Sequence, residues 1–109
     1  MITVTVLREA GNPVGFRVSG HAYQGEYGED IVCAGVSAVV QTAILGITDV
    51  LGLKAGYSVD EGDTSCILDR DTGAEDLERA AIVFGTMLAG LRAIQAAYPR
   101  TLKFRSKEV

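Results

Sequence analysis

The chain has 109 residues but only two prolines, two cysteines, one histidine and no tryptophan. Two cysteines without a C-x-x-C pair cannot form a disulfide framework, so reduced thiols in a reducing cytoplasm are expected, with a single bridge as the alternative. One histidine and two distant cysteines are too few for a structural zinc site. The sequence also lacks a phosphate-binding loop, a dinucleotide fingerprint and G-x-S-x-G. We therefore expect no metal and no cofactor.

Positive charge is also scarce, because 10 Lys+Arg face 14 Asp+Glu and the net charge is −4. No run of five basic residues occurs, so neither nucleic acid nor an anionic membrane is an expected partner. An acidic surface favours a basic partner instead. The N-terminus MITVTVLREAG lacks a basic start followed by a long apolar core. No signal peptide is predicted, and a cytoplasmic location is expected.

The longest uncharged run, residues 31–48, reaches the lower limit of a membrane span. Polar residues interrupt it, and no basic cluster or aromatic belt flanks it. A fully buried helix is therefore predicted. With 48% hydrophobic and 22% charged residues, the composition is typical of a globular protein, and residues 1–109 are predicted to form one domain.

Apolar and polar residues alternate in several short segments, as they do in strands that bury one face. The expected strands are residues 1–8, 14–19, 58–61, 64–69 and 102–105. A turn is predicted at residues 10–13, and a second at Gly62-Asp63.

Two long helices are expected between these strands. The first runs from Ile31 to Leu51, with Asp30 as its N-cap and Gly52 as its stop. The second begins after Thr72, whose spacing from Glu75 suits a capping box, and ends near residue 98. Its predicted apolar stripe consists of Leu77, Phe84, Leu88, Leu91 and Ile94.

The predicted fold is α+β, a two-layer β-β-α-β-β-α-β arrangement in which a mostly antiparallel sheet carries both long helices on one face. The helix 31–51 is apolar nearly all round, which is more surface than one sheet face can cover. A homodimer with one of the helices near its interface is therefore expected.

The single histidine and one cysteine suggest catalysis. His21 follows a predicted strand, and Cys33 falls at about the third residue of the apolar helix. The positive end of a helix dipole stabilises a thiolate, and a thiolate paired with an imidazolium is a common activated nucleophile. Backbone N–H groups of the first turn are candidate donors to an oxyanion. The alternatives are that Cys33 only packs in the core and that His21 is a solvated loop residue.

Several neighbours are candidates for supporting roles. Asp30 caps the helix, orients the imidazole, or does both, and Ser37 lies one turn beyond Cys33 on the same helical face. Gly20, Gly25 and Gly28 belong to a glycine-rich segment, residues 20–29, that we expect to be mobile and to close over a bound peptide. By contrast, Cys66 lies inside a predicted strand and is interpreted as structural.

Two stretches carry a family resemblance: Gly20-His21-Ala22, and residues 26–38 with the sequence EYGEDIVCAGVSA. They resemble the ribosomal-processing cysteine proteases of bacteria, the Prp family, and the likeness extends over essentially the whole chain. One small departure is Gly35, where an alanine is expected. The resemblance implies a small α+β homodimer with Cys33 as nucleophile and His21 as general acid/base, and it assigns supporting positions to Asp30 and Ser37.

The resemblance further implies a substrate. The family's enzymes remove the N-terminal extension of large-subunit ribosomal protein L-twenty-seven during ribosome maturation, after a short apolar segment that contains Phe. Two other functions remain open on the residues alone. One is a non-catalytic peptide-binding or ribosome-assembly module, and the other is a different thiol enzyme that transfers an acyl group or sulfur on the same two residues.

Overall fold

The computed structural model describes residues 1–21 and 29–109. Residues 22–28, which include Gly25 and Gly28, and the side chains of Glu29 and Asp30 lie outside the description, and with them the expected closure of the loop. The elements follow the predicted order: β1 (Ile2–Glu9), β2 (Asn12–Ser19), α1 (Glu29–Leu45) continued by a π-helical turn (Gly46–Val50), β3 (Ala55–Asp60), β4 (Asp63–Leu68), α2 (Ala74–Ala97) and β5 (Leu102–Glu108).

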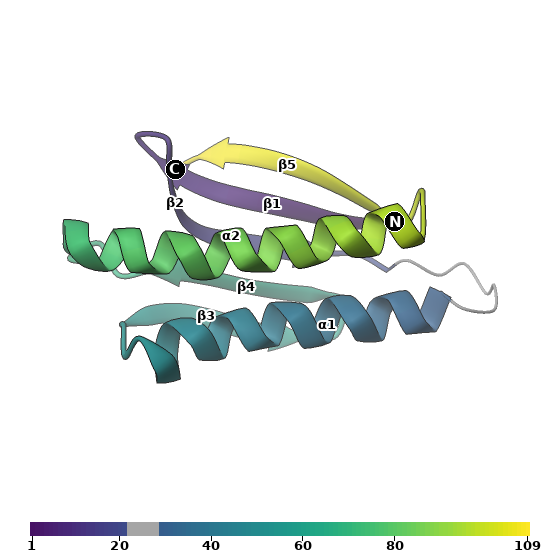
Figure 1. The fold of residues 1–109 in the computed structure, drawn as a ribbon, viewed down its shortest axis with the longest axis horizontal. Helices are drawn as coiled ribbons and strands as arrows, with labels where there is room; N and C mark the ends of the chain where they lie inside the picture. The colour runs from purple at the N-terminus through teal and green to yellow at the C-terminus, as the bar shows by residue number, and fades with distance from the viewer. Residues whose placement is uncertain (22–28) are drawn as a thin grey trace.

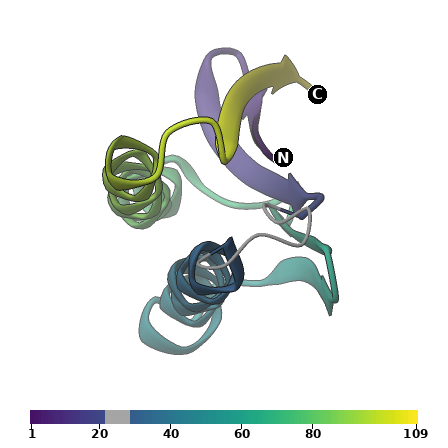
Figure 2. The same cartoon turned by 90° about the vertical axis from the view of Figure 1, so that its right-hand side faces the viewer.

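The five strands form one sheet in the order β3-β4-β2-β1-β5. The central pair aligns Val4 with Val18 in antiparallel register, whereas β5 runs parallel to β1 at the edge and aligns Phe104 with Val4. Figure 1 shows both long helices lying along the sheet, and the end-on view of Figure 2 places them on the same face. The predicted two-layer α+β architecture is thus confirmed.

The core lies between the sheet and the two helices. Ile2, Val4 and Val6 are buried, whereas the residues between them are only half-buried, as strand alternation predicts. Phe16 of β2 meets Phe84 of α2 edge to face, with ring centroids 6.0 Å apart. A fully buried side chain of this kind contributes about 1.5–3 kcal/mol through the hydrophobic effect. The buried stripe of α2 is Ala80, Phe84, Met87 and Leu91, so the predicted Leu77, Leu88 and Ile94 lie at its margins.

The helix α1 differs from its prediction at both ends. It begins at Glu29, so Asp30 belongs to the first turn rather than preceding it. Cys33 is then the fifth helical residue, two residues further in than expected. At the other end the last turn widens into the π-helical turn, where the N–H of Leu51 donates to the carbonyl of Gly46 at 3.0 Å.

The prediction that α1 is fully buried is wrong. One stripe faces the sheet, including Val32, Val36 and Val40. By contrast, Ile31 and Leu45 of α1 are 58% and 54% exposed, and Val50 of the π-helical turn is 80% exposed. By length and composition alone, Ile31–Val50 and Ala74–Ala97 could each cross a membrane, and only 33% of the most apolar stretch of the first is buried. A single sheet face can cover only one side of a helix, so the rest of this apolar surface stays open in the monomer.

Two turns also differ from prediction. The hairpin between β3 and β4 turns at Glu61-Gly62, one residue earlier than expected, because Asp60 pairs with Asp63 and Gly62 adopts the left-handed φ of +75°. Before α2, Gly73 is the N-cap and no side chain caps the helix. The hydroxyl of Thr72 instead donates to the carbonyl of Asp69 at 2.6 Å, which removes it from the predicted capping box.

Candidate active site

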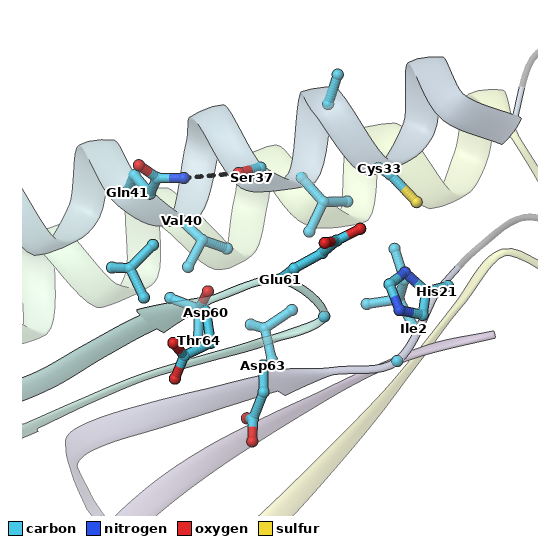
Figure 3. A pocket seen from close by; sticks show the side chains of 16 residues that line it. Ile2, His21, Cys33, Ser37, Val40, Gln41, Asp60, Glu61, Asp63 and Thr64 are labelled. Atoms are coloured by element: carbon cyan, nitrogen blue, oxygen red, sulfur yellow. Dashed lines mark hydrogen bonds between the residues drawn. The ribbon is translucent and has the colours of Figure 1, made fainter.

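A pocket of about 390 Å³ opens between α1, the start of β1, the end of β2 and the β3–β4 turn. Figure 3 shows the side chains around it. Its apolar floor includes Ile2, Val18, Val36 and Val40, and its polar wall includes His21, Cys33, Ser37, Asp60, Glu61 and Asp63. The fold therefore brings His21 and Cys33, from different elements, to one end of one pocket.

Cys33 reaches this pocket from the second turn of α1. Its side chain is half-buried and packs against the hydrophobic core, and Figure 3 shows the sulfur projecting from the helix into the pocket. Since the helix begins at Glu29, the backbone N–H of Cys33 already belongs to the helical hydrogen-bond ladder. The first-turn N–H groups of any α-helix have no acceptor within the helix, so those of the preceding turn are the candidate donors to an anion.

His21 lies two residues beyond the end of β2, and close contacts hold the backbone of Gly20 between them. Gly20 has a φ of +97°, and its N–H donates to the carbonyl of Gly62 at 2.9 Å. A Cβ added at Gly20 would lie 2.5 Å from the carbonyl oxygen of Met1. Only glycine adopts this φ and fits this close contact without strain, so Gly20 lets the chain turn sharply into His21.

Ser37 lines the same pocket one helical turn beyond Cys33, as predicted. Its Oγ accepts a hydrogen bond of 2.7 Å from Nε2 of Gln41, drawn in Figure 3. Both side chains are exposed, so the bond orders a polar wall of the pocket at little cost in buried polar surface. The side chain of Asp30 lies outside the described residues, and its orienting role remains a prediction.

The β3–β4 turn makes one side of the pocket acidic. Asp63 is neutralised by Arg17, whose Nη2 lies 2.9 Å from Oδ2, and the hydrogen bond from Arg17 lowers the pKa of the Asp63 carboxyl. Asp60 accepts a hydrogen bond of 3.0 Å from the hydroxyl of Ser58. Figure 3 shows the Glu61 carboxylate reaching across the pocket toward the end where Cys33 and His21 lie.

Sequence reasoning missed Glu61 and Gly62 as parts of this site. The only local signal was a turn dipeptide, and nothing in the sequence states that this turn lies beside His21. The β3–β4 turn lies beside His21 because β4 pairs with β2, which aligns Asp63 with Ser19.

Cys66 differs from Cys33 in its burial and does not line the pocket. It lies in β4, is only 1% exposed and is part of the core. Burial raises the pKa of its thiol from the ordinary 9.0 to about 11. The structure thus supports the interpretation of Cys66 as a packing residue.

Comparison with known proteins agrees with the fold and the pocket. A family profile described as cysteine protease Prp matches residues 1–103. The ribosomal processing cysteine protease Prp of Staphylococcus aureus (strain Mu50) is 32% identical over 109 residues, covering 98% of this chain and all of the relative.

Two crystal structures of the S. aureus protease, described as an essential ribosomal processing protease, are similar to this one. One holds a substrate peptide (TM-score 0.80, 28% identity) and the other a covalently linked product peptide (TM-score 0.79, 29% identity). Each comparison covers 98% of this chain and 100% of the other. The resemblance noted in the sequence is therefore confirmed.

Proposed function

The chain belongs to the cysteine protease Prp family, and we propose that it is an endopeptidase that uses Cys33 and His21 to remove the N-terminal extension of ribosomal protein L-twenty-seven during ribosome maturation. The observation that carries the proposal is the convergence of these two residues. The only histidine of the chain and the cysteine near the start of α1 line the same end of one pocket. Catalysis by a thiol protease requires at least a cysteine nucleophile and a general base in the same cleft.

The proposed reaction is acyl transfer in two steps. The thiolate of Cys33 attacks the scissile carbonyl carbon, and free N–H groups of the first turn of α1 stabilise the oxyanion. As the C–N bond breaks, the imidazolium of His21 gives its proton to the leaving amine, which leaves a thioester on Cys33. His21 then takes a proton from water. The resulting attack on the thioester releases the acid and regenerates the thiolate.

A basic peptide with an apolar segment suits the pocket. Its floor is apolar, and its β3–β4 wall carries the carboxylates of Asp60 and Glu61, while Asp63 is already paired. Together with the net charge of −4, this wall attracts a positively charged chain. The relative's name and its bound peptide support a ribosomal protein precursor as the substrate class.

The proposed working form is a homodimer in the cytoplasm, where ribosomes mature. Beside the exposed apolar side of α1, a cavity of about 530 Å³ lies between the two helices and is lined mainly by small and apolar residues. Ile82 at its edge is 71% exposed, which suits an interface better than water. Light scattering at micromolar concentration should give twice the mass of one chain. The substitution Ile82→Lys should lower the measured mass toward that of a single chain. A wild-type monomer contradicts the assembly, and recovery of the protein in the membrane fraction contradicts the location.

The decisive experiment is incubation with the L-twenty-seven precursor of the same organism, read by intact mass. Wild type and Cys66→Ala should both release the extension, whereas Cys33→Ser and His21→Ala should not. Cys66→Ala is the matched control because it removes the thiol that lies in the core. Binding without cleavage by the wild type favours a non-catalytic module. A covalent adduct on Cys33 from another donor, again without cleavage, favours a different thiol enzyme.

A further inference from the structure

Gly62, at the tip of the β3–β4 turn, lies directly against the imidazole of His21. A Cβ added to Gly62 would be 2.7 Å from Nε2 and 2.9 Å from Cε1 of the ring. Both distances are shorter than the 3.5–4.0 Å at which nonbonded atoms pack favourably. Any side chain at Gly62 must therefore displace the imidazole. The atoms it would meet, Nε2 and Cε1, are at the far end of the His21 side chain, which can rotate away.

The backbone of Gly62 holds the same region from a second direction. Its carbonyl accepts the N–H of Gly20 at 2.9 Å, which ties the hairpin tip to the residue just before His21. The turn therefore contacts the chain around His21 in two places. It accepts a hydrogen bond from the backbone of Gly20, just before His21, and it packs against the imidazole ring. Since Gly62 also lines the pocket with Cys33, a shift of the ring there changes its position relative to the nucleophile.

We propose that Gly62 is a positioning residue for His21, and that its missing side chain is what allows the imidazole to take its place at the Cys33 end of the pocket. The inference rests on the proposed function, because it assigns Gly62 a role in the same proton transfers. Proton transfer requires hydrogen-bond reach, and a displacement of about 1 Å in an active site costs on the order of a hundredfold in rate.

The test is Gly62→Ala, and the chain offers two matched controls. Gly62 has a φ of +75°, so alanine there also strains the backbone. Gly11 and Gly52 have φ values of +83° and +65°, but an added Cβ meets nothing within 4 Å at either position. Gly11→Ala and Gly52→Ala therefore carry the backbone strain without the contact. Gly62→Asn is the second variant, because asparagine tolerates the left-handed conformation better than alanine and still brings a Cβ.

Two measurements decide the matter. Cleavage of the precursor peptide should lose at least about tenfold in kcat for both Gly62 variants, with a smaller change in KM. The two controls should stay within about twofold of wild type, and all alanine variants should lose similar thermal stability. His21 is the only histidine, so the carbon-bound ring protons give unambiguous NMR signals. These signals should move in the Gly62 variants and stay in place in the controls.

The positioning role is overturned if the ring signals of the Gly62 variants match those of the controls, whatever the cleavage rate. It is equally overturned if the signals move and kcat does not fall. The proposed function fails separately. If His21→Ala or Cys33→Ser cleaves at the wild-type rate, the catalytic assignment is wrong, and the NMR series still reports whether Gly62 sets the position of the imidazole.

Discussion

The two cysteines should differ in their rate of alkylation by at least two orders of magnitude. Alkylating reagents react with the thiolate, not the thiol. Burial raises the pKa of Cys66 from 9.0 to about 11, and each pKa unit is a factor of ten in thiolate at a given pH below it. At neutral pH Cys66 therefore presents about a hundredfold less anion than an ordinary cysteine. Its exposed fraction of 1% slows the reagent further.

Cys33, by contrast, is accessible to a reagent, since it is only half-buried and lines the pocket with His21. The assay is a time course with iodoacetamide at pH 7, quenched and read by peptide mass mapping, so that both thiols are followed in one sample. Cys33 should be fully labelled before Cys66 is detectable. In guanidinium chloride the two rates should become similar, because unfolding removes the burial that separates them.

Equal labelling of the two thiols in the native protein, or faster labelling of Cys66, would refute the reasoning. His21→Ala separates two causes of the contrast. If pocket access alone makes Cys33 reactive, the variant should label at the wild-type rate. If the imidazole helps to form the thiolate, labelling should slow in parallel with the loss of cleavage. Cys66→Ala should leave the Cys33 rate unchanged.

Three further predictions follow from the same contacts. The raised pKa of Cys66 means that its contribution to stability is complete below pH 9 and declines by roughly 1 kcal/mol per pH unit up to pH 11; urea titrations should show a loss that Cys66→Ala lacks. Phe84→Ala removes a ring that is 1% exposed and packs edge to face on Phe16, so it should cost about 3–5 kcal/mol, and a loss below 1 kcal/mol would contradict this packing. Glu61→Lys should raise KM for a basic peptide several-fold at low salt, with the effect fading at high salt, while Glu78→Lys on exposed α2 surface should not.

Local patterns in the sequence were sufficient for the architecture. Alternation at Ile2, Val4 and Val6 identified β1, and the spacing of Phe84 and Leu91 identified the buried side of α2. These patterns work because side-chain direction repeats every two residues in a strand and every 3.6 in a helix. They were less reliable at element ends, where Thr72 bonds to Asp69 instead of capping α2, because a polar side chain there chooses among several nearby backbone groups.

The sequence by itself determined the two residues proposed for catalysis, because a lone histidine and a cysteine near a helix start are chemically distinctive wherever they occur. Only the tertiary structure decided what surrounds them. The turn at Glu61 and Gly62 follows His21 by about 40 residues, and it reaches the imidazole only because β4 pairs with β2. Such pairing is selected by the burial of a whole sheet face against two helices, and no short stretch of sequence contains that information. A glycine in a turn therefore becomes a wall of the pocket.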